Sequence, residues 1–204
     1  MVETPHSMEL SQYSINPIIQ LTMEVNLERV IQILRTRGRS QYGGEAVTQL
    51  DHGLQCATLA AAVHSPPQLI SACLLHDFGH LVSGLQEDAS QLINDFHEQR
   101  GAIWLSQLFP PRVTEPIRLH VAAKRYLCTR DPGYNSQLSP VSRASLVLQG
   151  GFLDNATADD FIQQPYAIDA VQLRRWDEQS KIPMETTLDL TDFIPILQSC
   201  LFSP

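Results

Sequence analysis

The chain has 204 residues, of which 43% are apolar and 18% are charged, a composition that fits one globular domain and excludes a disordered or low-complexity chain. The net charge of −8 disfavours nucleic acid and anionic membranes as partners, although a few buried cations can still bind a small anion. The four cysteines lack C-x-x-C spacing, which excludes a zinc ribbon and indicates free thiols in a cytoplasmic protein.

The two ends of the chain differ in character. Residues 1–24 lack the basic and apolar segments of a signal peptide, and we expect a loose N-terminal leader there. Residues 25–204 show no internal repeat and no linker, so we expect them to form one domain. The longest apolar run, over 57–63, is too short to cross a membrane.

Apolar residues at helical spacing predict helices along most of this domain. The first begins near Leu27 and ends at Gly38, and a loop over 38–45 follows. The next helix, over about 46–64, is apolar on two sides, as in a buried central helix. Pro66 and Pro67 open a third helix, for which Gly79 suits an end or a break.

The helical pattern continues to the C-terminus. We expect a helix over about 88–108, a second that is capped by Thr114, and a third that begins at Ser139-Pro140 and ends at Gly150-Gly151. The remaining helices are expected at Thr157 and over 166–179 and 191–201. Because no alternating strand pattern or hairpin signal appears, the sequence predicts an all-α fold, a single helical bundle.

Five of the seven histidines lie on or beside these apolar helices: His52, His76, His80, His97 and His120. One such histidine is more often a hydrogen-bonded core residue than a ligand. Five are harder to explain in this way, because each unpaired buried polar group costs roughly 1–3 kcal/mol. A shared metal centre satisfies several at once, and the adjacent pair His76-Asp77 offers ligands that suit iron, manganese or zinc.

His52, the pair His76-Asp77 and the later Asp177 form an H…HD…D pattern that resembles the HD-domain superfamily. The segment 74–80 resembles the superfamily's H-D-I-G stretch, with Phe78 in place of isoleucine. The resemblance covers residues 42–177. It implies an all-α HD-domain bundle with a metal site in its core, and most often a phosphohydrolase activity.

Further features resemble a narrower branch, the mixed-valent di-iron oxygenases that cleave phosphonates. Tyr42 and Glu45 form a Tyr-x-x-Glu pair shortly before His52, and two additional histidines follow later in the chain. A lysine, Lys124, lies one turn after the last of these histidines. This branch implies an Fe(II)/Fe(III) pair as cofactor, O2 as co-substrate and a small anionic phosphonate as substrate.

The resemblance implies a role for each matching residue. The ligands of one iron are His52, His76, Asp77 and Asp177, and Asp77 bridges to a second iron that His97 and His120 complete. The phosphonate-binding residues are His80, Lys124, Ser142 and Arg174. Tyr42 and Glu45 form a mobile lid and, with His80, are the expected catalytic residues.

Helical spacing supports part of this assignment independently. Lys124 is four residues after His120, and Arg174 is three before Asp177, so each cation shares a helix face with a candidate ligand. Cations beside metal ligands suit an anion that docks at the metal. The alternatives are that both cations are solvated, that Glu45 only favours a helix N-terminus, and that Ser142 is an ordinary first-turn residue.

Three function classes remain at this stage. The first is a di-iron oxygenase that cleaves the C–P bond of a small 1-hydroxy-organophosphonate and releases phosphate. The second is a metal-dependent phosphohydrolase that acts on a phosphate ester or nucleotide, which has no obvious need for the Tyr-x-x-Glu pair. The third is a non-catalytic scaffold, against which the complete ligand set argues. We expect the first; the sequence does not fix its substrate or its oligomeric state.

Overall fold

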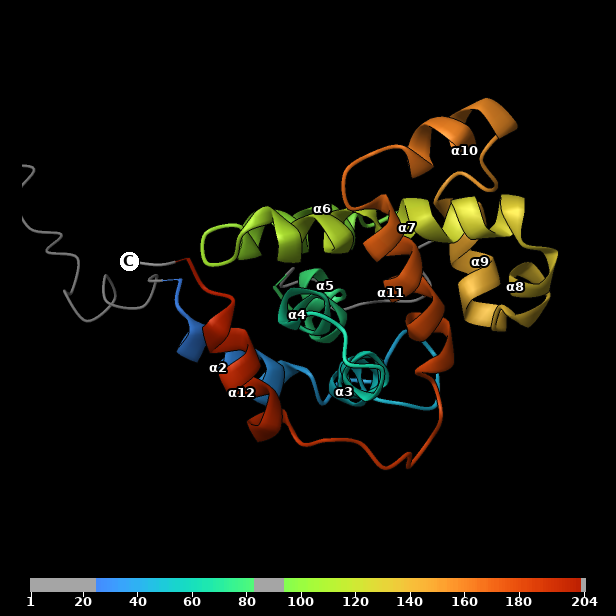
Figure 1. The fold of residues 1–204 in the computed structure, drawn as a ribbon. Coiled ribbons are helices and arrows are strands. Elements are labelled where there is room, and N and C mark those ends of the chain that lie inside the picture. Colours follow the sequence, from blue (N-terminus) through green and yellow to red (C-terminus); the bar gives the residue numbers. More distant parts are fainter. Residues whose placement is uncertain (1–24, 83–93, 203–204) are drawn as a thin grey trace, which may run out of the picture.

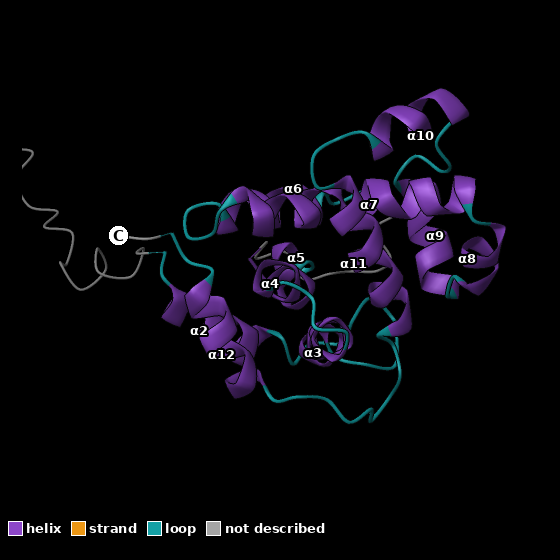
Figure 2. Cartoon of the chain, in the orientation of Figure 1, coloured by secondary structure: helices purple, strands orange, loops and turns teal. Residues whose placement is uncertain are grey.

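The computed structural model describes residues 25–82 and 94–202, and these ranges fold into helices joined by loops (Figure 1). The predicted leader, 1–24, lies outside the described residues. Figure 2 shows no strand in the described ranges, where one isolated backbone bridge joins Gln41 to Thr48. The all-α prediction is confirmed. The helices are α2 (Leu27–Arg37), α3 (Gln49–Ala62), α4 (Pro67–Leu75), α5 (Phe78–Val82), α6 (His97–Leu105), α7 (Pro111–Arg130), α8 (Pro132–Gln137), α9 (Pro140–Leu148), α10 (Asn155–Ile162), α11 (Ala167–Gln179) and α12 (Leu190–Ser199).

Helix α4 lies in the middle of the bundle and contacts α3, α7, α11 and α12 (Figure 1). Every residue from Leu69 to Leu75 is buried, because the segment is apolar all round and therefore has no face suited to water. The pair His76-Asp77 follows directly at the C-terminal end of α4. The core helix thus places this pair in the interior of the molecule.

Glycines allow the neighbouring helices to approach this pair closely. A Cβ atom on Gly53 of α3 would lie 2.8 Å from the carbonyl oxygen of Leu74, so α3 and α4 can pack this tightly only without a side chain there. A Cβ atom on Gly79 would overlap the carbonyl oxygen of His97 at the start of α6. Gly79 therefore lies inside α5 and permits a close helix crossing, rather than ending or breaking a helix as the sequence suggested.

Two predicted helix starts are wrong. The helix expected over 88–108 begins at His97, since Asp95 is not helical and Phe96 adopts the left-handed conformation with φ of 50°; residues 88–93 lie outside the described ranges. Thr114 lies within α7, which starts at Pro111, where a missing N–H leaves no helix bond unmade. The expected start at Ser139-Pro140 is confirmed, as the Ser139 hydroxyl accepts from the Ser142 amide at 3.0 Å.

All four cysteines are buried free thiols, as expected. Among the helices of the described ranges, none combines the length and hydrophobicity that a membrane crossing requires.

Candidate metal centre and anion pocket

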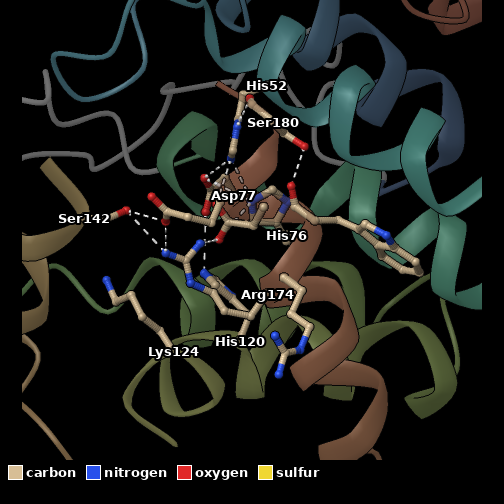
Figure 3. Close-up of polar contacts among 12 residues, drawn as sticks. His52, His76, Asp77, His120, Lys124, Ser142, Arg174 and Ser180 are labelled. Carbon is tan, nitrogen blue, oxygen red and sulfur yellow. Dashed lines mark hydrogen bonds and ion pairs between the residues drawn. The ribbon is translucent and has the colours of Figure 1, made fainter. Parts of the chain in front are cut away.

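Six imidazole and carboxylate side chains converge from five parts of the bundle. Figure 3 shows His52, His76, Asp77 and His120 among them. The six come from α3, from the end of α4, from the start of α6, and from α7 and α11. These six residues are His52, His76, Asp77, His97, His120 and Asp177, and all are buried. The structure therefore brings together the whole set that the sequence pattern singled out as ligands.

The first group of three consists of His52, His76 and Asp177, which we call the inner triad. The Nε2 atoms of His52 and His76 are 3.1 Å apart, and Asp177 Oδ1 is 3.4 Å from His52 Nε2. Each Nδ1 donates to a backbone carbonyl, of Ser180 at 2.7 Å for His52 and of Cys73 at 2.8 Å for His76. Because carbonyls only accept, Nδ1 carries a proton on both rings, and both direct Nε2 to the same point, where a metal ion would take the place of any proton on Nε2.

The inner triad favours a positive charge. Burial alone would lower the pKa of His76, but the negative charges of Asp77 and Asp177 outweigh it and raise that pKa to about 10. Burial likewise opposes ionisation of Asp177, yet Arg174 and the two histidines hold its pKa well below the usual range. An ionised carboxylate and two imidazoles around one point form a site suited to a cation.

The second group consists of Asp77, His97 and His120, which we call the outer triad. The two Nε2 atoms are 3.2 Å apart, and Asp77 Oδ1 lies 3.4 Å from that of His97 and 3.6 Å from that of His120. His120 Nδ1 donates to the Ile117 carbonyl at 2.7 Å, so its Nε2 also offers a lone pair. Burial and the neighbouring His97 lower the pKa of His120 well below its ordinary value, which keeps this ring neutral.

Asp77 faces both triads. Its Oδ1 points to the outer triad, while its Oδ2 lies 3.3 Å from His76 Nε2 and 3.6 Å from His52 Nε2. Within the described residues, Asp77 Oδ2 and Asp177 Oδ1 are buried and accept no hydrogen bond. Such oxygens are costly to bury unless something satisfies them. Two metal ions, bridged by Asp77, fit this donor set in number and in chemistry.

A cavity of about 150 Å³ opens beside the outer triad. Apart from His52 and His76, every site residue that the sequence predicted lines it. Lys124 projects into this region and is 5% exposed (Figure 3). Its ammonium donates to Ser145 at 2.8 Å and, among the described residues, forms no ion pair with a carboxylate. Burial and the charges of Arg174 and Lys181 lower the pKa of Lys124 to about 7.

Both terminal nitrogens of Arg174 are engaged within the protein, while its buried Nε has no hydrogen-bond partner among the described residues. Its guanidinium forms an ion pair with Asp177 and a second with Glu178 at 2.8 Å, and it donates to the Ser142 hydroxyl at 3.3 Å. Ser142 in turn donates to Glu178 at 2.9 Å. The guanidinium therefore links the inner triad to the cavity, and Glu178 already occupies the donors of Arg174 and Ser142.

The loop over 38–45 covers the metal centre. The Tyr42 ring stacks on His52 with centroids 4.1 Å apart. Burial, the charges of Asp77 and Asp177, and a hydrogen bond with Asp77 raise the pKa of Tyr42 well above its usual value. Glu45 accepts from the Ser139 hydroxyl at 2.5 Å. Both residues lie at the cavity as a lid would, and Glu45 is attached to α9 rather than to the metal ligands.

His80 also lines the cavity. Its ring stacks on His97 with centroids 3.9 Å apart, and its Nδ1 is 3.0 Å from Asp95 Oδ2. Asp95 also accepts from His97 Nδ1 at 2.8 Å and from Arg100 at 3.2 Å. The Asp95 carboxylate thus orients the His97 ring so that the Nε2 atom of the ring faces Asp77 and His120.

Three residues of this site were not identified from the sequence: Asp95, Glu178 and Lys181. A signal existed for Glu178, which follows Arg174 by four residues and so shares its face of α11. Lys181 lies beyond the end of α11 at Gln179, where helical spacing gives no signal. Asp95 had no such signal. It reaches His97 through the left-handed turn at Phe96, which helical periodicity does not predict.

Comparison with known proteins adds the family. No family model matches the chain. It is similar to a hydroxymethylphosphonate dioxygenase of Gimesia maris, with 41% identity over 174 residues, or 84% of this chain and 86% of the relative. It is also similar to a 1-hydroxy-2-(trimethylamino)ethylphosphonate dioxygenase (glycine-betaine-forming) of Leisingera caerulea, with 40% identity over 167 residues, or 81% and 85% of the two chains. An uncharacterized protein of Acanthamoeba polyphaga mimivirus is 32% identical over 162 residues, 77% and 73% of the two.

The two bacterial relatives match this chain over most of their own length and most of its length. Their shared activity is that of a phosphonate dioxygenase, which is the branch that the H…HD…D pattern and the Tyr-x-x-Glu pair resemble. The protein therefore belongs to the phosphonate dioxygenase branch of the HD-domain superfamily, and it is a metal-binding oxygenase.

Proposed function

We propose that the protein cleaves the C–P bond of a small 1-hydroxy-organophosphonate oxidatively and releases phosphate, with two iron ions in the two triads. The observation that carries this proposal is the position of Asp77, whose two oxygens face separate pairs of histidines. Iron bound there supplies the redox chemistry that O2 activation requires. Six ligands are too many for one tetrahedral ion, which supports two metals.

The residues around the cavity bind and orient the substrate in this proposal. Lys124 pairs with the phosphonate, since it is a buried cation whose hydrogen bond goes to a serine. Arg174 and Ser142 add donors when the anion replaces Glu178 as their partner. His80, held by Asp95, lines the same cavity and contributes a further donor. A phosphonate held by these donors places its carbinol carbon beside the outer triad.

Tyr42 and Glu45 cover the site until substrate arrives. The Tyr42 ring shields His52, and its hydroxyl hydrogen-bonds with Asp77. Substrate displaces this contact and opens the centre to O2 at the moment when an oxidisable bond is present. The loop carries Gly43 and Gly44, both at positive φ, which is a backbone conformation that glycine adopts without strain.

The phosphohydrolase alternative is less well supported. The inner triad with Asp77 would suffice for a hydrolase, which leaves the pairing of His97 with His120 and the stacking of Tyr42 on His52 without a purpose. The two named relatives are dioxygenases. Both observations favour the oxygenase.

Anaerobic purification with metal analysis and electron paramagnetic resonance tests the proposal. We expect two irons per chain and the signal of a coupled mixed-valent pair, and O2 uptake with phosphate release when hydroxymethylphosphonate is added. A protein that holds a single metal, consumes no O2 with any hydroxyphosphonate and hydrolyses phosphate esters would contradict it.

A further inference from the structure

A second lysine, Lys181, lines the cavity next to Glu45 of the lid. It follows the C-terminus of α11 and lines the same cavity as Lys124. Its ammonium lies 2.6 Å from the Ser142 hydroxyl, 3.1 Å from Glu178 Oε2 and 3.6 Å from Glu45 Oε1. The side chain is 9% exposed, so these contacts are only weakly screened by water.

Lys181 changes what Glu45 can bind. Of the carboxylates that line the cavity, Asp77 and Asp177 belong to the triads, and Asp95 is held by His80, His97 and Arg100. Glu45 remains as the carboxylate that an ammonium group of a substrate would approach. Its Oε1 already accepts from Ser139 and faces Lys181, so its charge is compensated within the protein.

The names of the two relatives show that substituent charge varies within this family. The hydroxymethyl group of one substrate is uncharged, while the trimethylamino group of the other is a cation. A pocket distinguishes two such ligands either through attraction for one or through a repulsive group against the other.

We propose that Lys181 is a specificity-determining residue, which makes this pocket select hydroxyphosphonates with an uncharged substituent and reject those with an ammonium group. The inference rests on the proposed function. A cationic substituent near Glu45 would face Lys181 at a separation of a few ångströms and would have to share a carboxylate with it. Repulsion between two poorly solvated unit charges at that range is large enough to decide between substrates.

The test uses two substrates of nearly the same shape. In 2-amino-1-hydroxyethylphosphonate the substituent ends in an ammonium group, and in 1-hydroxypropylphosphonate a methyl group takes its place. We expect the wild-type iron-loaded enzyme to prefer the methyl compound, with kcat/KM for phosphate release about tenfold higher or more. Lys181→Met should lower this ratio by about tenfold, since it keeps the length of the side chain and removes the charge. Lys181→Arg keeps the charge and should keep the preference.

The outcomes separate this inference from the function on which it rests. Equal or better turnover of the ammonium compound by the wild type overturns the role of Lys181, as does an unchanged ratio in Lys181→Met. If Lys181→Met does not fold, Lys181→Gln replaces it in the same comparison. Absence of O2-dependent phosphate release from both compounds and from hydroxymethylphosphonate overturns the proposed function, and the inference with it.

Discussion

The two sides of Asp77 are built differently. On the inner side, His52 and His76 are fully buried, and each ring is fixed by a backbone carbonyl of the packed core. On the outer side, His120 is likewise held by the Ile117 carbonyl, but His97 is oriented by the side chain of Asp95, and both rings lie next to the cavity. A backbone carbonyl in or at the end of a packed helix cannot shift independently, whereas a side chain on a turn can.

This difference separates a rigid half of the centre from an accessible half. The inner triad is enclosed by α3, α4 and α11, with the Tyr42 ring stacked on His52. All three residues of the outer triad line the cavity together with Lys124 and His80, whereas of the inner triad only Asp177 does so. A small anion therefore reaches the centre from the Oδ1 side of Asp77, and the variants below test whether the two halves depend on each other.

The largest effect is expected for Asp77→Ala, because this residue is shared by both halves. We expect turnover to fall by on the order of 10³-fold or more and bound metal to decrease in both triads, measured by O2 uptake and metal analysis. Asp159→Ala is the control, since this aspartate is 74% exposed and far from the ligands along the chain. Retention of two metals per chain in Asp77→Ala would show that Asp77 does not bridge them.

A comparison of His52→Ala with His97→Ala tests the difference in rigidity. In metal-free protein we expect His52→Ala to lower the free energy of unfolding by about 2–3 kcal/mol, because it leaves a cavity in the core and an unpaired Ser180 carbonyl. For His97→Ala we expect a loss of about 1 kcal/mol, since the space joins an existing cavity. Urea unfolding in the presence of a chelator measures both. Equal losses would mean that the outer half is packed as tightly as the inner half.

Lys124 is expected to make substrate binding depend on pH. Its pKa is lowered from 10.5 to about 7, so the side chain is charged below pH 7 and loses its charge as the pH rises above it. A neutral amine cannot pair with a phosphonate, and the affinity should therefore fall with increasing pH above about 7. Calorimetric measurement of substrate affinity from about pH 6 to about pH 9, which covers the titration of this ammonium group, tests the expectation.

Two substitutions separate the titration of Lys124 from that of the phosphonate itself. Lys124→Arg keeps its charge throughout this range, so the fall in affinity should shift to higher pH. Lys124→Met should weaken binding at pH 6 by about 1.5–3 kcal/mol, the value of a charge-assisted contact. The same pH profile in all three proteins would remove Lys124 from the substrate site.

The sequence predicted most of the helices because buried and exposed residues alternate at helical spacing. It failed where tertiary contacts decide the outcome. Gly79 looks like a helix end in isolation, but its lack of a side chain serves the crossing of α5 and α6. His97 looked like the middle of a long helix, yet it is the first residue of α6.

The candidate ligands were recognisable because a pattern of histidines and aspartates is conspicuous on apolar helices. The polar network of Glu178, Lys181 and Ser142 was not recognisable, since a glutamate and a lysine near the end of a helix are typical of a solvated surface. Only the fold places them against Ser142 from α9, 36 and 39 residues away in sequence. Charged residues on a helix acquire a functional interpretation only when the element opposite them is known.

The smallest effect is expected for Tyr42 and Glu45, the lid residues of the proposed function, because neither belongs to the two triads. Tyr42→Phe keeps the ring that stacks on His52 and removes the hydroxyl that hydrogen-bonds with Asp77. Glu45→Gln keeps an acceptor for Ser139, whereas Glu45→Ala removes it. We expect Tyr42→Phe and Glu45→Ala to retain phosphate release within a few-fold and to consume O2 without substrate at a higher rate.

The reason is that premature opening uncovers His52 and the inner side of Asp77, so that O2 reaches the centre when no carbinol carbon lies beside it. Simultaneous recording of O2 uptake and phosphate release gives their ratio, and Glu45→Gln should lie between Glu45→Ala and the wild type because it still anchors the loop to α9. A wild-type ratio in Tyr42→Phe and Glu45→Ala would show that the lid does not gate O2. The loop would then only cover the rigid half of the centre, and the cavity on the Oδ1 side would be the route for both substrates.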